Sequence, residues 1–159
     1  MQIEKYKTET DHTNLEYTFL SIGRSVIKKK IVYEKFEEPE YIGLPSNTLV
    51  YNLGFGDFDE QTGGIDDKIA SNNGDMDKIL ATVAETAFNF WGSYPNALLY
   101  FRGSNPTGQQ SLRTYLYQKK LNRYFNEIND FAEIFGLTID GWEEFVINKN
   151  YIAFLILKK

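Results

Sequence analysis

The chain has 159 residues, of which 42% are hydrophobic and 16% aromatic, and its formal net charge is −5. A chain of this length and composition can bury a hydrophobic core without help from disulfides or bound metal ions, which excludes wholesale disorder. The sequence contains no cysteine and a single histidine, which excludes disulfides, cysteine nucleophiles, cysteine-ligated zinc and multi-histidine metal sites.

The first part of the chain predicts an antiparallel hairpin. Residues 1–14 are polar and are expected to form a mobile segment ahead of the folded domain. Residues 15–22 and 26–36 are rich in β-branched and aromatic side chains and are separated by a turn, as expected of two paired strands. The run Lys28-Lys29-Lys30 in the second strand is expected to form a charged edge or a solvated strand face.

The middle of the chain predicts strands on either side of a helix. Residues 48–55 and 64–70 are expected to pair across a loop rich in glycine and aspartate. Apolar residues at helical spacing predict a helix over 75–91, which Asp75 would cap. The almost wholly apolar run 97–101 predicts a strand that is buried on both faces and lies parallel to an earlier strand.

The last third of the chain predicts a second helix and a terminal hairpin. Ser104-Asn105-Pro106 has the residue types of a helix start. An apolar stripe at helical spacing continues toward Gly136, and polar residues from Gln118 onward interrupt it, which predicts a bend or two helices. Residues 138–147 and 151–157 are expected to pair as a hairpin.

Together these elements predict the α+β class. Residues 15–159 are expected to form a single domain. Its mixed, mostly antiparallel sheet would have about six to eight strands, with about two or three helices packed on one face.

The clustered carboxylates after residue 55 have two interpretations. Asp57, Asp59 and Gln61 have the alternating spacing of a calcium loop, but the glycine is displaced and no glutamate closes the loop. Neighbours on a strand point to opposite faces, so at most one of Asp66 and Asp67 shares a side with the other acids. The favoured interpretation is a hairpin turn with no cofactor, and the alternative is a site for Mg²⁺ or Ca²⁺.

A candidate anion site lies where the central strand is expected to end. Arg102, Ser104 and Asn105 stand between this strand and a helix start, where free backbone N–H groups and the helix dipole favour an anion. Arg113, on the helix that follows, would add a second guanidinium group. The simpler interpretation is an ordinary strand-to-helix turn.

The second predicted helix carries basic residues interleaved with tyrosines. Such a surface can hold phosphates and stack bases, whereas the plainer interpretation is a solvated helix face whose tyrosines half-cover the core. The residues of this basic helix face are Arg113, Tyr117, Lys119, Lys120 and Arg123.

Five segments of the chain are distinctive when taken together in order, namely YNLGFGD at 51–57, SNNGD at 71–75, KILATVAETAFNF at 78–90, GS and RTYLY around 103–117, and NYIAFLI at 150–156. In these segments the chain resembles a family of small bacterial proteins that is catalogued only as a domain of unknown function. The resemblance implies a stand-alone cytoplasmic bacterial domain, and it carries over no activity, cofactor or catalytic residue. The insertion of residues 105–112, and Tyr115 where a second arginine is expected, depart from the family pattern and weaken a two-arginine clamp.

The remaining features bear on location and partners. No apolar stretch approaches the roughly 20 residues of a membrane helix, and no secretory signal is seen. With the lack of cysteine, these features predict a cytoplasmic protein without a membrane partner. The acidic net charge disfavours nucleic acid.

These observations favour a non-enzymatic binding module that takes a protein partner or a small anionic ligand. It would serve as the accessory or antitoxin-like half of a bacterial two-gene system, with self-association as a further option. One alternative is a Mg²⁺-dependent enzyme acting on phosphoesters or nucleotides. The other is nucleic-acid binding through the basic helix face.

Overall fold

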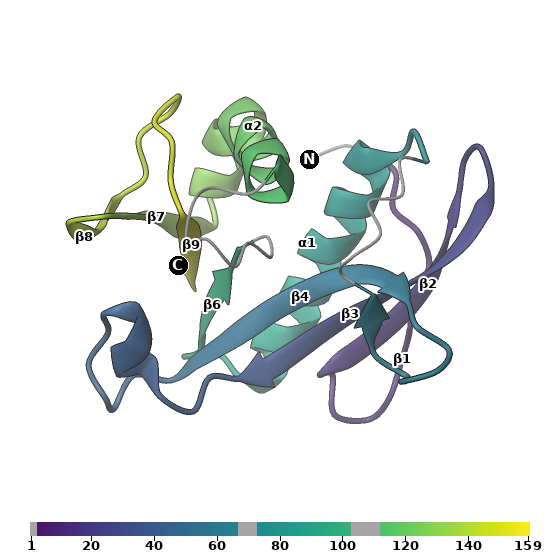
Figure 1. Cartoon of the computed structure of the whole chain (residues 1–159), viewed down its shortest axis with the longest axis horizontal. Coiled ribbons are helices and arrows are strands. Elements are labelled where there is room, and N and C mark those ends of the chain that lie inside the picture. Colours follow the sequence, from purple (N-terminus) through teal and green to yellow (C-terminus); the bar gives the residue numbers. More distant parts are fainter. Residues whose placement is uncertain (1–2, 67–72, 103–111) are drawn as a thin grey trace. The chain divides into compact units, whose positions relative to one another are not determined.

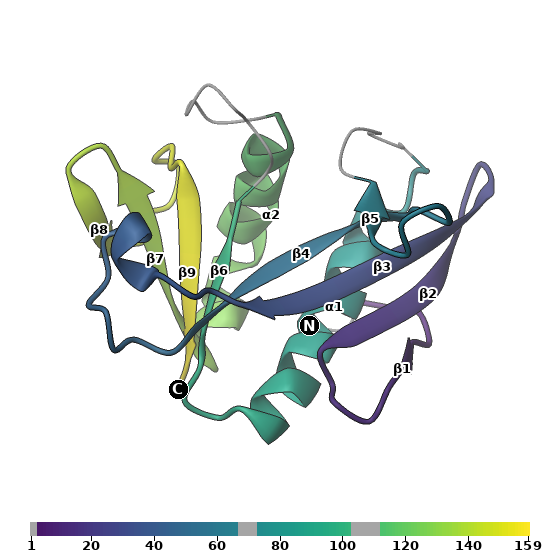
Figure 2. The same ribbon diagram turned by 60° about the horizontal axis from the view of Figure 1, so that its bottom comes forward.

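The computed structural model describes residues 3–66, 73–102 and 112–159, which contain nine strands and two α-helices (Figures 1 and 2). Neither described helix is long and apolar enough to cross a membrane. The elements are β1 (Glu9–Thr10), β2 (Glu16–Ile22), β3 (Val26–Lys35), the 3₁₀ turn η1 (Pro39–Ile42), β4 (Val50–Phe58), β5 (Ile65–Asp66), α1 (Met76–Ser93), β6 (Leu98–Phe101), α2 (Leu112–Asn129), β7 (Ala132–Thr138), β8 (Gly141–Glu144) and β9 (Ala153–Lys158).

The described strands form one sheet in the order β1-β2-β3-β4-β6-β9-β7-β8, with β5 paired to β4. The sheet is mostly antiparallel, and β4 and β6, which α1 separates in the sequence, are parallel. The predicted α+β class and mixed sheet are therefore confirmed. The described strands exceed the upper expected number by one, and β1 and β5 have only two residues each.

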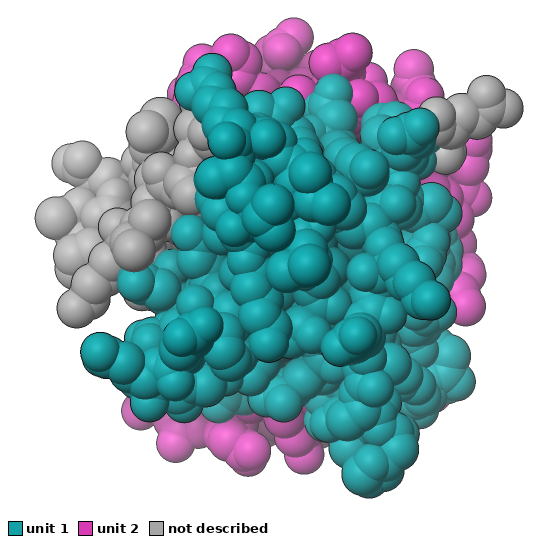
Figure 3. Space-filling model, turned by 90° about the vertical axis from the view of Figure 1, so that its right-hand side faces the viewer, with its two compact units in different colours: residues 1–34, 53–95 teal, residues 35–52, 96–159 magenta. Residues whose placement is uncertain are grey.

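Contacts divide the chain into two compact units, each built from two separate segments of sequence (Figure 3). Unit 1 comprises Met1–Glu34 and Leu53–Pro95, and unit 2 comprises Lys35–Asn52 and Asn96–Lys159. Each unit contains one of the two described helices.

The core of unit 1 forms where α1 packs on the β2–β3 hairpin. The ring of Tyr33 stacks on Phe90 of α1 with centroids 4.6 Å apart, and it meets the edge of Tyr17 at 6.0 Å. Its hydroxyl is 2.7 Å from Oγ1 of Thr86, so the buried polar end of the tyrosine is hydrogen-bonded. The alternating hairpin and the amphipathic helix thus fold as their periodicities predict.

The N-terminal segment, expected to be mobile, supplies a buried side chain to unit 1. Tyr6 is 8% exposed, stacks on Phe19, and donates its backbone N–H to Oγ1 of Thr82 at 2.8 Å. Its hydroxyl and that of Ser21 both donate to Oδ2 of Asp75 at 2.5 Å. Asp75 therefore occupies the predicted N-cap position of α1, but its carboxylate accepts from these hydroxyls and makes no side-chain capping hydrogen bond to the helix.

Lys29 is buried, which corrects the expectation of a wholly solvated lysine run. The period of two places Lys29 on the face that also carries Ile31, opposite Phe19 in the register of β2 and β3. The lysine is 6% exposed and forms an ion pair with Asp57 of β4. A buried ammonium group needs such a partner, so the lysine and one acid of the predicted metal cluster neutralise each other.

In unit 2, the strands β6, β9 and β7 are covered on both faces. Phe154 of β9 packs with Leu121 of α2 on one face, whereas Leu155, the next residue, packs with Tyr100 and Trp142 on the other. The prediction of a central strand that is apolar on both faces is confirmed for β6.

Two predictions for the last third of the chain are wrong. The apolar stripe does not stay helical to Gly136, because α2 ends at Asn129 and residues 132–138 form β7, whose burial alternates with a period of two. The hairpin joins β7 to β8 through the two-residue turn Ile139-Asp140, and β9 pairs with β7 and β6 instead. Gly141, the first residue of β8, adopts a φ of 121°, which glycine tolerates best, so the chain turns here and not at residues 148–150.

Two further predictions lie outside the described residues, namely the helix start at 104–106 and residues 67–70 of the strand after the acidic loop.

We predict that Gly136→Ala destabilises the protein by about 1–3 kcal/mol, the range for overpacking a core. An added Cβ would lie 2.2 Å from Cδ1 of the buried ring of Tyr151. The measurement is urea unfolding. The control is Gly92→Ala in α1, where a Cβ meets nothing within 4 Å, so stability should be unchanged or higher. Equal stability of the two variants would contradict the packing shown here.

Candidate functional site

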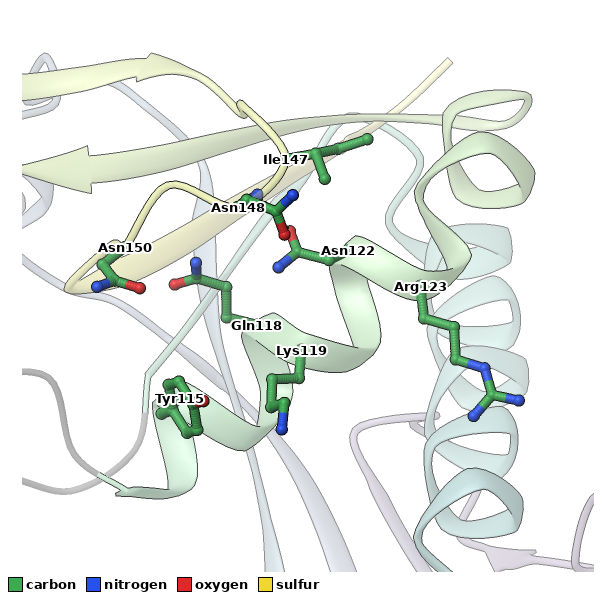
Figure 4. A pocket seen from close by; sticks show the side chains of 8 residues that line it. All are labelled: Tyr115, Gln118, Lys119, Asn122, Arg123, Ile147, Asn148 and Asn150. Carbon is green, nitrogen blue, oxygen red and sulfur yellow. The ribbon is translucent and has the colours of Figure 1, made fainter.

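A groove of about 500 Å³ lies in unit 2 between α2 and the loop of residues 145–152 that joins β8 to β9 (Figure 4). Two cationic side chains and four amide side chains line it, and none of the lining residues that the structure describes is a carboxylate. The lining residues are Tyr115, Gln118, Lys119, Asn122, Arg123, Ile147, Asn148 and Asn150.

One face of α2 is buried in the core and another is exposed beside the groove. Tyr117 and Leu121, four residues apart, are buried, and Leu121 packs into the core of unit 2. Tyr115, Lys119 and Arg123 repeat at the same interval on another face and are exposed. The amphipathic pattern of the helix thus fixes which side chains border the groove.

The amide of Gln118 fixes one wall of the groove. This side chain is only 3% exposed, and its Oε1 accepts the backbone N–H of Tyr151 at 3.0 Å. Its Nε2 donates to the backbone carbonyl of Lys149. A single buried amide therefore satisfies a donor and an acceptor of the loop, each of which would be costly to leave unbonded.

Asn122 makes a second attachment one turn further along α2. Its Oδ1 accepts the backbone N–H of Asn148 at 3.1 Å. Asn148 has a φ of 69°, in the left-handed region that asparagine tolerates better than most residues. Figure 4 shows Gln118 and Asn122 pointing from the helix toward the loop, so α2 holds the loop at two points.

A third attachment joins the loop to β8. Lys149 Nζ lies 2.7 Å from Oε2 of Glu143, and the hydroxyl of Tyr151 donates to the same oxygen at 2.9 Å. The hydrogen bonds from Lys149 and then Tyr151 lower the pKa of Glu143 below its ordinary value of 4.5. The hydrogen bond to Glu143 raises the pKa of Lys149, and burial raises that of Tyr151.

The rim of the groove is positively charged. Lys119 Nζ lies 5.4 Å from the ring centroid of Tyr115, which is 43% exposed. In Figure 4, Lys119 and Arg123 extend from the helix away from the loop, whereas the amides of Gln118 and Asn122 point toward it. The arrangement offers cationic groups at the rim and amide groups within, which suits an anion that also carries polar groups.

The predicted basic helix face is divided by the structure. Lys119 and Arg123 line the groove. Tyr117 is buried and meets the ring of Phe101 edge-on at 6.3 Å, so it is a core residue. Lys120 lies outside the lining, and the side chain of Arg113 lies outside the described part of the chain.

The predicted anion site after the central strand stays a prediction. Arg102 directly follows β6 and is half-buried. Ser104 and Asn105 lie outside the described residues, as does the side chain of Arg113.

The structure places two of the predicted metal ligands opposite each other, and two of them have structural partners. Asp57 pairs with Lys29, and Asp66 lies opposite Asp57 in the register of β4 and β5. Asp59 shapes the hairpin, because its Oδ1 accepts the backbone N–H of Gln61 at 2.9 Å.

In the described part of the chain, no three His, Cys, Asp or Glu side chains are placed to hold a metal ion. Asp67 lies outside the described residues, and a Mg²⁺ or Ca²⁺ site at these acids stays a prediction.

Sequence reasoning missed the amides that build the groove. Gln118 interrupts the apolar stripe of α2, and this polar residue at a core position was the available signal. Asn148 and Asn150 fall between the predicted strands 138–147 and 151–157, where the sequence indicates only a turn. Their approach to α2 follows from how β9 pairs, which local pattern does not encode.

We predict that Gln118→Leu destabilises the protein by about 1–3 kcal/mol, since it removes the partner of the buried Tyr151 N–H and of the Lys149 carbonyl. Hydrogen exchange of the Tyr151 amide should accelerate. Asn126→Leu, an exposed position on the same helix, is the matched control and should stay within about 0.5 kcal/mol of the wild type. If Gln118→Leu leaves both the stability and the exchange rate of the Tyr151 amide unchanged, the amide of Gln118 does not hold the loop.

We predict that acid loosens the loop through Glu143. A carboxyl whose pKa is lowered by folding stabilises the folded state above its unfolded pKa, and this stabilisation is lost as the pH falls through the folded pKa, here below 4.5. NMR should show loop amides shifting together with the Glu143 carboxyl carbon. Glu143→Gln should abolish this response and Glu144→Gln should retain it, and the reverse pattern would contradict the assignment.

Comparison with known proteins places the chain in a family. No curated protein and no solved structure matches it. The family model described as a family of unknown function, DUF6934, matches residues 2–159, which is nearly the whole chain. The chain therefore belongs to the DUF6934 family.

Proposed function

We propose that this protein is a non-enzymatic binding module that holds an anionic ligand in the groove beside α2. The observation that carries the proposal is the charge of the described lining residues, which include two cations and no carboxylate in a chain of net charge −5. A local reversal of sign against the rest of the molecule favours capture of a negative group at this place.

The cations and the amides suit complementary parts of such a ligand. Arg123 offers a planar guanidinium group to a carboxylate or phosphate, and Lys119 offers a compact charge one helical turn away. Gln118 and Asn122 already hold the opposite wall in place. Because the loop is ordered before the ligand arrives, less conformational entropy is lost on binding.

The composition of the lining favours binding over chemistry. Among its described residues there is no serine, cysteine, histidine or carboxylate, so the groove itself offers no nucleophile–base pair. The anion would be a free small molecule or an acidic group on a partner protein. We place this role in the bacterial cytoplasm, where a cysteine-free sequence fits the reducing conditions.

We predict that inorganic pyrophosphate at low salt shifts the NMR amide signals of Asn122, Asn148 and Asn150. Lys119→Ala or Arg123→Ala should weaken binding about three- to tenfold, since each removes one charge-assisted contact. Added salt should weaken binding further.

The matched control is Lys120→Ala, a lysine on the same helix that does not line the groove, and its affinity should be unchanged. The absence of any shift, or an equal loss in the Lys120 variant, would contradict the proposal.

A further inference from the structure

The groove carries an exposed aromatic ring, that of Tyr115, which the binding of a simple anion does not need. It is 43% exposed on the groove, with the ammonium of Lys119 5.4 Å from its centroid. A simple inorganic anion gains nothing from an aromatic face, whereas a planar heterocycle stacks on one. The ring and the cation together suit a ligand that joins a flat group to a negative one.

The asparagines of the loop supply a second requirement of such a ligand. The side-chain amides of Asn148 and Asn150 make no hydrogen bond to the rest of the described residues, and both line the groove. Each amide presents a donor and an acceptor side by side, which is the pattern that pairs with the edge of a nucleobase. Asn122, whose Oδ1 is engaged by the loop, keeps its Nδ2 as a further donor.

From these features we infer that the ligand is a nucleotide, a conclusion that rests on the proposed anion-binding function. Its base lies on Tyr115 and is read by the loop amides, and its phosphates lie at Lys119 and Arg123. Residues four apart on a helix are separated by about 6 Å along its axis, so the ring and the cations are spread along the groove as base and phosphates are in a nucleotide. A groove of about 500 Å³ lies in the size range of small-molecule sites.

Charge favours a single nucleotide over a nucleic acid strand. The net charge of −5 repels a polyanion more strongly with each phosphate that lies beyond the two rim cations. An acidic peptide would use the cations but would leave the ring and the base-like pairing of the amides unused.

The test is calorimetric titration of the whole chain with the four common nucleoside monophosphates, ribose 5-phosphate, pyrophosphate and an oligoglutamate peptide. At least one nucleotide should bind about tenfold or more tightly than ribose 5-phosphate, from stacking of its base. Tyr115→Ala should remove this advantage over ribose 5-phosphate, whereas Tyr115→Phe should retain it. Tyr124→Ala is the matched control, since this tyrosine also lies beside a cation on α2 but does not line the groove.

The outcomes separate this inference from the proposed function. If pyrophosphate binds but no nucleotide exceeds ribose 5-phosphate, the nucleotide assignment is overturned and anion binding stands. If the peptide binds more tightly than every nucleotide, the anion belongs to a protein partner and the assignment again falls. If none of the probes binds, both ideas fall.

Discussion

The groove depends on one buried amide. Gln118 accepts from the backbone of Tyr151 and donates to that of Lys149, and Asn122 adds a second contact from α2 to the loop before β9. Phe145 and Tyr151 bury the two ends of the loop in the core, whereas residues 146–150 between them are exposed. The position of this exposed stretch therefore depends on satisfied polar groups, which tolerate little change in geometry.

The polar contacts around the loop also include an ion pair. Lys149 and Tyr151 both engage the carboxylate of Glu143, which ties the loop to β8. Among the described residues that line the groove, the charged ones are the two cations of α2. The charge of the groove therefore comes from the helix, whereas the acid of this network is paired with a lysine.

Unit 1 uses its carboxylates for structure. Asp57 neutralises the buried Lys29, and Asp59 shapes the hairpin turn. Asp75 accepts hydrogen bonds from the hydroxyls of Tyr6 and Ser21. Each of these acids has a clear structural partner among the described residues. The groove in unit 2 is accordingly the better-supported site, although it lies in a part of the sequence with no recognisable motif.

The sequence by itself determined the elements whose patterns are strong and local. These are the β2–β3 hairpin, the amphipathic α1 and the doubly buried β6, because periodicity and turn residues encode them directly. Only the tertiary structure decided that residues 132–138 are a strand, that Lys29 finds Asp57, and that Gln118 meets the loop. Each of these depends on a partner distant in sequence, and a polar residue at a core position reveals its role only once that partner is in place.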